Sequence, residues 1–504
     1  MKRVLVANRG EIALRIIRGC HEEDLEAVAV YSDADEHAAH VRAADAAVHI
    51  GPAAPAESYL RVDKLLDAAR RTGADAVHPG YGFLAERAEF AAAVAKAGLT
   101  FIGPPAQAIA AMGDKTAARR RMREVGVPVV PGTVESLASA EAAKQIAKTL
   151  GYPILLKAAA GGGGRGMRIV RADGELAGAF EAAQGEATKA FGDGRIYVER
   201  LLERPRHVEI QVLADHHGRV IHLGERDCSV QRRHQKLIEE APSPAVTPAL
   251  RRAMGEAAVR AAQAVGYVSA GTVEFMLMPT GDFFFLEMNT RLQVEHPVTE
   301  MVYGVDIVRM QLKIAQGHHL SLPERALIPR GWAMECRITC EDPFGDFLPA
   351  GGVVADLRVS AGPGVRWDGW IEAATDVPLA YDSLLGKLIV WAESRERAIK
   401  RMRRALDDLV IVGVPTSREF HQRVLREPQF CKGEIDIGYW DRIGKDLMAR
   451  PPEPATVEAL AVAGALLEDE RRGAVRRAVA GNGAPPATHA ESAWLHVARQ
   501  EGLR

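Results

Sequence analysis

Residues 274–295 read EFMLMPTGDFFFLEMNTRLQVE and carry the most specific signal in the chain. The turn formers PTGD predict a β-hairpin centred between Thr280 and Gly281. This symmetry places Glu274 directly opposite Glu287, so that two carboxylates face each other across the strand pair. The stretch therefore predicts a paired-acid site on a sheet.

Polar residues occupy every second position after the hairpin turn. In chain order they are Glu287, Asn289, Arg291, Gln293 and Glu295. Period-two alternation predicts one extended segment with a polar face, whereas Phe275, Phe284 and Leu286 are expected to face the core. Carboxylates and an amide carbonyl are hard oxygen ligands, which predicts a Mg²⁺ site at Glu274, Glu287 and Asn289. A solvated strand face with compensating charges is the alternative.

A glycine run follows the apolar segment ILLK, which ends at Lys157. It consists of Gly161, Gly162, Gly163, Gly164, Arg165 and Gly166. Adjacent glycines let backbone N–H groups approach phosphate oxygens, and the two cationic side chains add charge. The lysine precedes the glycines, so the run is neither a P-loop nor a dinucleotide fingerprint. It predicts a phosphate-binding loop, with a flexible surface hairpin as the alternative.

The basic segment QRRHQK, from Gln231 to Lys236, follows ERDCSV. Such a run is usually solvated surface. Beside a phosphate loop and a metal site it becomes a candidate clamp on a transferring phosphate.

Composition excludes several classes of protein. The chain has 504 residues, 47% of them hydrophobic and 26% charged, with a net charge of -2. This favours a soluble protein of about three domains and offers no field for nucleic acid or an anionic membrane. No apolar run approaches the roughly 18 residues of a membrane span, and no signal peptide is evident. With five scattered cysteines, we expect a reducing, cytoplasmic location.

Strands alternate with helices at the start of the chain, which predicts a doubly wound parallel sheet of the α/β class. The region from Arg195 to Asn289 is richer in strands and predicts an α+β nucleotide-binding part. A strand, helix, strand order follows between about residues 330 and 440.

Ten motifs occur in a fixed order over roughly residues 1–440. They are GEIALRIIR, HPGYGFLAE, FIGP, GDK, KAAAGGGGRGMRIV, RHVEIQV, RDCSVQRRHQKLIEEAPSP, EMNTRLQVEHPVTE, ECRI and AYDSLLGKLIV. Together they resemble biotin carboxylase, an ATP-grasp enzyme, and RLQVEHPVTE separates this family from other ATP-grasp ligases.

The resemblance implies an ATP-grasp fold with an N-terminal doubly wound parallel-sheet domain, a mobile lid and a C-terminal domain. The expected boundaries are 1–113 for the N-terminal domain, 114–317 for the ATP-grasp domain with its lid, 330–440 for the C-terminal domain and 446–504 for a helical extension. Thr339 and Cys340 after ECRI, and Ser417 in GVPTSREF, depart from the residues common in the family.

The resemblance also implies a role for each site residue. ATP binding falls to Lys115, Lys157, Gly161 to Gly166, Glu199, Leu202, His207, Gln231 and His234. Mg²⁺ or Mn²⁺ would be bound by Glu274, Glu287 and Asn289, in agreement with the hairpin argument. Bicarbonate binding falls to Arg291, Gln293 and the Val294 N–H, and biotin binding to Tyr81 and Arg337. Catalysis falls to Glu295 as the base, Arg337 on the biotin enolate, Arg291 and Lys236.

The implied activity is ATP-dependent carboxylation of biotin with bicarbonate, through carboxyphosphate. The biotin is expected on a separate carrier protein, the second partner is expected to be a carboxyltransferase subunit, and a homodimer is the usual assembly. The complete enzyme would be a multi-subunit acyl-CoA or 2-oxoacid carboxylase, such as acetyl-CoA or propionyl-CoA carboxylase, because the acceptor is chosen by a carboxyltransferase on another chain. Alternatives are a component of a two-subunit pyruvate carboxylase, a non-catalytic nucleotide-binding paralogue, or an ATP-grasp ligase for another acid.

Two features bear on the partners. The chain has no Met-Lys-Met tripeptide, and its last lysine is Lys445, so residues 446–504 offer no biotin attachment site. A predicted helix there carries Leu460, Val462, Leu466 and Leu467 on an apolar side, which indicates a docking element. Packing on its own domain is the alternative.

Overall fold

The computed structural model describes residues 1–133, 136–137, 139–158, 167–323, 327–449, 455, 458–467 and 469–470. The chain divides into two compact units, Met1–Met448 and Ala449–Arg504. Among the described helices, none is long and apolar enough to cross a membrane. The predicted glycine loop, Gly161 to Gly166, lies outside the described residues.

The first unit begins with a five-stranded sheet in the order β3-β2-β1-β4-β5, in which every neighbouring pair is parallel. Its strands are β1 (Arg3–Val6), β2 (Glu26–Ser32), β3 (Ala46–Gly51), β4 (Ala76–His78) and β5 (Thr100–Phe101); its helices are α1 (Gly10–Glu22), α2 (Ala39–Ala43), α3 (Val62–Thr72), α4 (Ala88–Lys96) and α5 (Ala106–Gly113). The predicted doubly wound parallel sheet is confirmed. Ile12, Ile16 and Ile17 of α1 are buried, as their helical spacing predicts.

An antiparallel sheet of eight strands forms the centre of the unit, in the order β13-β12-β9-β10-β11-β14-β21-β19. Its strands are β9 (Arg206–Ala214), β10 (Val220–Arg232), β11 (Gln235–Ala241), β12 (Ser269–Leu277), β13 (Phe283–Asn289), β14 (Trp332–Thr339), β19 (Val365–Gly369) and β21 (Leu384–Ala392). Helices α6 (Lys115–Glu124), α9 (Pro248–Ala264), α10 (His296–Tyr303) and α11 (Ile307–Ala315) accompany it. The sheet runs without a break from the predicted ATP-grasp part into the predicted C-terminal part.

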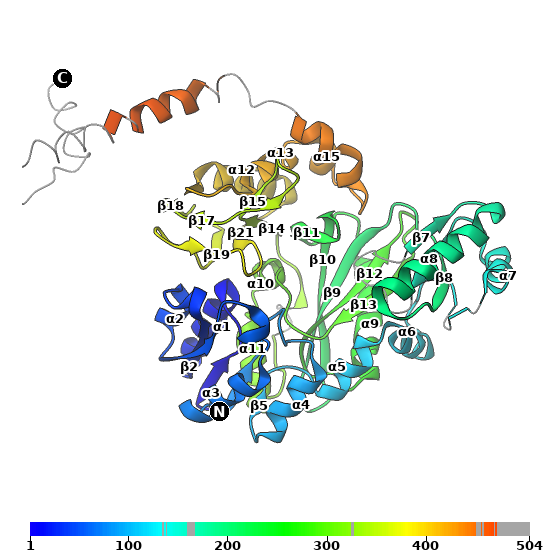
Figure 1. Cartoon of the computed structure of the whole chain (residues 1–504), viewed down its shortest axis with the longest axis horizontal. Helices are drawn as coiled ribbons and strands as arrows, with labels where there is room; N and C mark the ends of the chain where they lie inside the picture. Colours follow the sequence, from blue (N-terminus) through cyan, green and yellow to red (C-terminus); the bar gives the residue numbers. More distant parts are fainter. Residues whose placement is uncertain are drawn as a thin grey trace, which may run out of the picture. The chain divides into compact units, whose positions relative to one another are not determined.

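A small separate layer stands at one side of the central sheet, where Figure 1 shows α7 and α8 over short strands. It has three strands in the order β7-β6-β8, namely β6 (Ile154–Ala158), β7 (Met167–Val170) and β8 (Ile196–Arg200), and the helices α7 (Ala140–Leu150) and α8 (Leu176–Phe191). We call residues 139–158 and 167–200 the lid. The lid has its own core, formed by residues such as Leu156, Phe180 and Val198.

Short strands and helices complete the unit after β14. The strands are β15 (Glu341–Asp342), β16 (Leu348–Pro349), β17 (Gly352–Val353), β18 (Asp356–Arg358), β20 (Asp376–Val377) and β22 (Val410–Val412), and the helices are α12 (Arg395–Asp408), α13 (Arg418–Val424), α14 (Pro428–Lys432) and α15 (Tyr439–Ala449). In the second unit, residues 458–467 are helical, as predicted, and Leu460, Val462, Leu466 and Leu467 are exposed.

Arg226 is the largest fully buried residue among the described residues of the first unit. Its guanidinium donates to Glu209 and Gln211 on β9, to Thr272 on β12, to Thr299 on α10 and to Gln293 in the loop before α10. A buried cation is stable only when its donors are all satisfied. One side chain therefore ties three neighbouring elements and a loop together.

We expect Arg226→Met to destabilise the protein by about 3–5 kcal/mol, because it leaves buried acceptors without their cation. Denaturant titration measures this loss of unfolding free energy. The exposed control Arg426→Met should change stability by less than about 0.5 kcal/mol. A loss at Arg226 no larger than that of the control would contradict the structural role.

Candidate active site

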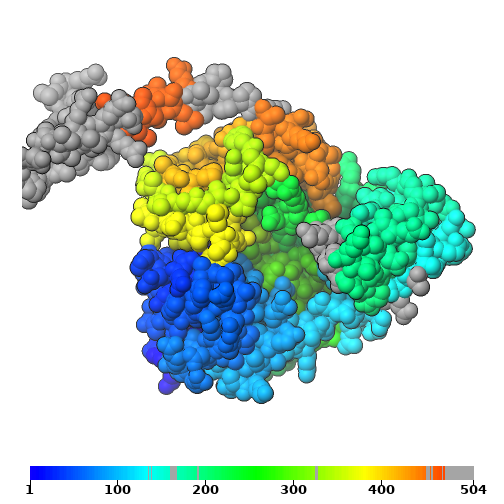
Figure 2. All heavy atoms as spheres, viewed as in Figure 1, coloured from blue at the N-terminus to red at the C-terminus, as the bar shows by residue number. Residues whose placement is uncertain are grey.

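A cavity of about 970 Å³ opens where the N-terminal domain, the central sheet and the lid meet. Figure 2 shows the surface hollowed between the blue N-terminal part and the green and yellow parts above it. The described residues predicted for the site all line it: Tyr81, Lys115, Lys157, Glu199, Leu202, His207, Gln231, His234, Lys236, Glu274, Glu287, Asn289, Arg291, Gln293, Val294, Glu295 and Arg337. Such a volume is at the upper end of ordinary ligand pockets.

The predicted pairing of Glu274 with Glu287 is confirmed, although the strand register between this pair and the turn differs from the expected one. Near the turn, Phe275 is opposite Phe285, one position away from the register that a turn centred between Thr280 and Gly281 would give. A bulge beside Glu274 restores the expected pairing. The bulge also changes the apolar face, because Phe285 is buried with Phe275.

The expectation for Phe284 and Leu286 is therefore wrong. Both are only half-buried, and Leu286 lines the cavity. The residue inserted by the bulge moves the inward positions by one in this part of β13.

The prediction of one extended segment through Glu295 is also wrong, because β13 ends at Asn289 and residues 290–295 form a loop that leads into α10. The loop nevertheless brings the alternating polar side chains together. Arg291 donates to Asn289 at 3.1 Å, and Gln293 donates to Glu274 at 2.9 Å. The period-two pattern identified the right residues, but a loop rather than a strand presents them.

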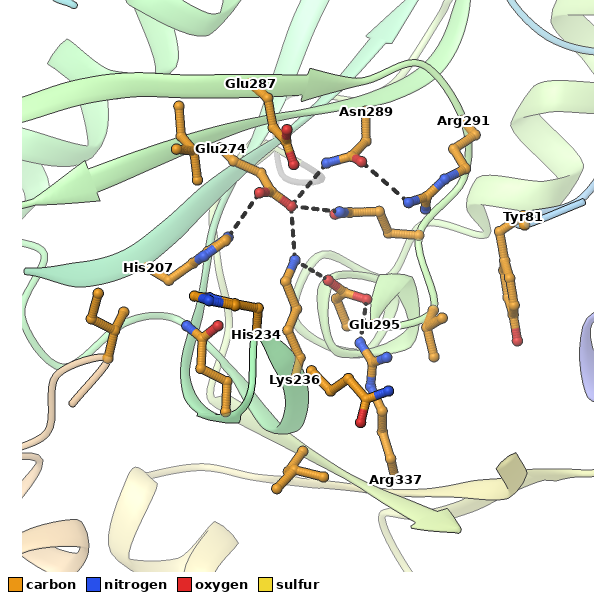
Figure 3. Close-up of a pocket in the computed structure, with 18 of the residues that line it drawn as sticks. Tyr81, His207, His234, Lys236, Glu274, Glu287, Asn289, Arg291, Glu295 and Arg337 are labelled. Carbon is orange, nitrogen blue, oxygen red and sulfur yellow. Dashed lines mark hydrogen bonds and ion pairs between the residues drawn. The ribbon is translucent and has the colours of Figure 1, made fainter. Parts of the chain in front are cut away.

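The basic segment forms a tight turn between β10 and β11. Gln231 is opposite Lys236 and Arg232 is opposite Gln235, so Arg233 and His234 are the two turn residues, both with positive φ. This turn places Lys236 at the start of β11, with its side chain directed into the cavity (Figure 3).

Lys236 joins three acidic side chains. Its Nζ donates to Glu209 at 2.5 Å, to Glu274 at 2.9 Å and to Glu295 at 2.6 Å (Figure 3 shows the last two). These carboxylates are almost fully buried. A buried cluster of like charges is unstable without a shared counter-ion, so this ammonium group holds the acids in place.

The charged groups in this cluster shift one another's pKa values. Burial alone would lower the pKa of Lys236, but Glu209, Glu274 and Glu295 outweigh it and raise that pKa well above its usual value. Burial would likewise raise the pKa of Glu295, but Lys236, Arg337 and Arg226 hold it well below its ordinary range. At neutral pH the site therefore contains ionised carboxylates and a protonated lysine.

Arg337 on β14 lies on the other side of Glu295. It donates to Glu295 at 2.8 Å and to Glu239 on β11 at 2.6 Å. Burial raises the pKa of Glu239 to about 7, with Arg337 opposing the shift and Glu295 adding to it. Arg337 is thus held by one carboxylate that is ionised at neutral pH and one that titrates there.

The lid side of the cavity carries the cations predicted for nucleotide phosphates. Lys115 begins α6 and lies 3.1 Å from Glu287. Lys157 on β6 lies 2.7 Å from Glu199 on the adjacent strand, and Arg119 of α6 contacts the same carboxylate. Lys115 and Lys157 are therefore each paired with an acid that a bound phosphate would have to replace.

Two overlapping sets of residues could hold a divalent cation. Glu274 faces Glu287 across the hairpin, and Asn289 donates to Glu274 at 2.8 Å, which fits the predicted set of oxygen ligands. In the second set, one possible ligand atom from each of Glu274, His207 and Glu209 lies within 4.8 Å of the other two. Carboxylate-rich donors suit Mg²⁺ or Mn²⁺, so the residues present fit the ion that the sequence predicts.

Sequence reasoning missed several charged residues that surround the predicted ones, most of them buried. They are Glu209 and Arg226 beneath Lys236, Glu239 behind Arg337, Arg119 at Glu199, and Glu86, which accepts from Arg291 at 2.9 Å. His207, Glu209 and Gln211 alternate along RHVEIQV, and this polar alternation in a buried strand was an available signal. No local pattern marks Glu86.

Two departures from the family pattern are in direct contact. The Ser417 hydroxyl donates to the Arg337 carbonyl at 2.9 Å and accepts from the Thr339 N–H at 3.0 Å. Ser417 and Thr339 thus support the backbone on both sides of Ile338, beneath Arg337.

Three consecutive parts of the chain match models of known protein families. Residues 1–109 match "Biotin carboxylase, N-terminal domain", residues 114–323 match "Carbamoyl-phosphate synthase L chain, ATP binding domain" and residues 335–442 match "Biotin carboxylase C-terminal domain". A biotin carboxylase of Nostoc sp. is 52% identical over 443 residues, which are 88% of this chain and 99% of that protein. A pyruvate carboxylase subunit of Methanothermobacter thermautotrophicus is 50% identical, over 89% of this chain and 91% of that protein.

Solved structures give the same result. A biotin carboxylase from Campylobacter jejuni, in complex with a βγ-ATP compound, has a TM-score of 0.82 and 48% identity, covering 88% of this chain and 98% of that one. The biotin carboxylase domain dimer of Hydrogenobacter thermophilus 2-oxoglutarate carboxylase, with MgADP, ADP and bicarbonate, has a TM-score of 0.83 and 46% identity, covering 90% and 99%.

The raised pKa of Glu239 gives a test by pH. Between about pH 4.5 and about pH 7, the Glu239 carboxyl of the unfolded protein releases its proton, whereas the same carboxyl in the folded protein keeps it. The unfolded state is therefore favoured as the pH rises, and the wild type should lose stability over this window relative to Glu239→Gln. We expect the melting temperature of the variant minus that of the wild type to become more positive between about pH 5 and about pH 8. The exposed control Glu22→Gln should show a constant difference, and a constant difference for Glu239→Gln would contradict the shift.

Proposed function

Because the chain belongs to the biotin carboxylase family, we propose that this cavity carries out the ATP-dependent carboxylation of biotin with bicarbonate. The observation that carries the proposal is the complete set of charged groups around Glu295, with Lys236 on one side and Arg337 on the other. A non-catalytic paralogue would be expected to lack a member of this set. Every described residue predicted for the reaction is present in the cavity.

In the first step, Glu295 would accept the proton of bicarbonate, and the resulting oxygen would attack the terminal phosphorus of ATP, releasing ADP. Arg291, Gln293 and the Val294 N–H are proposed to hold the anion. Mg²⁺ or Mn²⁺, held by Glu274, Glu287 and Asn289, would neutralise charge on the transferring phosphate.

Glu295 is ionised in the free protein but weakly basic, because two cations lie on it. We propose that the substrates draw these cations away. The negative charge of the transferring phosphate attracts Lys236. When the Lys236 ammonium group moves away from the Glu295 carboxylate, the proton affinity of Glu295 rises as bicarbonate arrives. The same cation then stabilises the phosphate in the transition state.

In the second step, carboxyphosphate would break down to CO₂ and phosphate. The released phosphate would take the proton of biotin N1′, and N1′ of the resulting enolate would attack the CO₂. Arg337 is suited to stabilise the biotin enolate because the guanidinium keeps its proton and offers a planar fork of donors. Burial would lower its pKa, but Glu239 and Glu295 raise it above the usual value. Tyr81 lines the same end of the cavity and is proposed to contact biotin.

The partners follow from this chemistry. We propose a separate biotin carrier protein, a homodimer and a carboxyltransferase subunit, with acetyl-CoA or propionyl-CoA as the final acceptor. The relative from Methanothermobacter, which belongs to a pyruvate carboxylase, makes pyruvate the second candidate for the acceptor. The exposed helix at residues 458–467 remains our candidate for docking these partners.

The function is tested by replacing the proposed base. We expect Glu295→Gln to retain nucleotide affinity but to lose about 10²–10⁴-fold in bicarbonate-dependent ADP formation, since positioned general bases contribute this much. Unchanged turnover would remove Glu295 from the mechanism. Wild-type ADP formation that does not respond to free biotin would favour a ligase for another acid.

A second test concerns the carrier. The sequence contains no Met-Lys-Met, so we expect these 504 residues to remain unmodified when expressed with an active biotin ligase. A streptavidin blot reads the outcome, with a biotinylated carrier domain as the positive control. A labelled band for this chain would contradict the assignment of biotin to a separate protein.

A further inference from the structure

A buried lysine outside the predicted set lies beneath the loop that leads into α10. Lys387 on β21 is fully buried. Its Nζ donates to the carbonyl oxygen of Val294 at 2.9 Å and lies 3.0 Å from Glu11 Oε1. A buried ammonium group is costly unless it is paired and hydrogen-bonded, so these contacts account for its place in the fold.

The strand register explains why this side chain reaches the loop. Lys387 is opposite Arg337 on β14 and opposite Asp368 on β19. Directly opposed residues point to the same face of a sheet, so the three side chains form a row. Helix α10 packs against β14 and β21 and begins immediately after Glu295. Lys387 therefore meets the chain at the entry to α10.

Glu11 extends this contact to the other end of the cavity. It is the second residue of α1 and is buried. Its Oε1 accepts from the Tyr81 hydroxyl as well as contacting Lys387, and its Oε2 has no hydrogen-bond partner among the described residues. One carboxylate oxygen thus connects a residue of the proposed biotin end with the lysine that holds Val294.

We propose that Lys387 and Glu11 are a positioning pair that orients residues 290–295, the loop proposed to bind bicarbonate, and couples it to the biotin end of the site. The anion's identity rests on the proposed function. The carbonyl that Lys387 holds belongs to the residue whose N–H is proposed to bind bicarbonate, and its peptide leads directly to Glu295. Fixing this carbonyl limits rotation of the backbone at both the anion donor and the base.

The variant Lys387→Met removes the ammonium group and keeps most of the side-chain volume. We expect the KM for bicarbonate to rise about 10- to 100-fold, because a small misplacement of binding groups has effects of this size. The KM for ATP should stay within about twofold, since Lys115, Lys157 and the lid are untouched. The exposed pair Lys400 and Glu396 supplies the control Lys400→Met, which should change neither constant.

A double variant separates positioning from stability. Lys387→Met alone leaves Glu11 as an unpaired buried charge and lowers the melting temperature. Lys387→Met with Glu11→Gln removes that charge, so the melting temperature should recover toward the wild-type value. The bicarbonate KM should stay raised, because Val294 still lacks its donor. Recovery of the bicarbonate KM, or an equal rise in the KM for ATP, would overturn the proposal. If the single variant does not fold, the double variant alone decides between these outcomes.

A direct measurement of bicarbonate binding distinguishes a failure of this proposal from a failure of the proposed function. Line broadening of ¹³C-bicarbonate in NMR spectra reports binding without turnover. Binding that the double variant weakens at least about tenfold supports the positioning role, even if the wild type forms no ADP and the proposed function fails. Equal binding of bicarbonate by the wild type and the double variant, or none by either, overturns the positioning role.

Discussion

The site depends on one ammonium group shared by three buried carboxylates. Lys236 contacts Glu209, Glu274 and Glu295 within 2.9 Å, and the three carboxylates are almost fully buried. Without it, acids from β9, β12 and the loop before α10 would repel one another at short range. The tight turn between β10 and β11 positions Lys236, so the backbone geometry of this turn determines where the shared positive charge lies.

We propose that the same constraint gives the site two arrangements of charge, one without and one with bound substrates. In the free protein the cations are paired with protein carboxylates. Lys236 outweighs the effect of burial and holds the pKa values of Glu274 and Glu295 well below their ordinary range. On the proposed function, an anionic substrate would compete for Lys236, Lys115 and Lys157, while a divalent cation would compete for Glu274 and Glu287. Binding of the nucleotide with its metal would exchange these internal pairs for external ones, so that little net charge would have to be buried. We propose that this exchange makes the strongly paired site reactive.

Sequence reasoning was accurate where the signal is local. The parallel sheet follows from alternating strands and helices, and the Glu274–Glu287 pair follows from hairpin symmetry even though a bulge alters the register beside it. It failed at residues 290–295, because a period-two polar pattern is the same for a strand and for a loop whose side chains converge. It could not find Glu239 or Lys387, because their partners are far away in the sequence and come close only after folding.

The account's central claim is that this cluster activates bicarbonate by joining it to the terminal phosphate of ATP. The most direct measurement follows the oxygen of ¹⁸O-labelled bicarbonate during turnover with Mg²⁺, ATP and free biotin. If bicarbonate oxygen attacks phosphorus and carboxyphosphate then releases CO₂, one labelled oxygen must appear in each phosphate formed. Phosphate without the label, released at the same rate as ADP, would mean that water is the nucleophile and would contradict the claim.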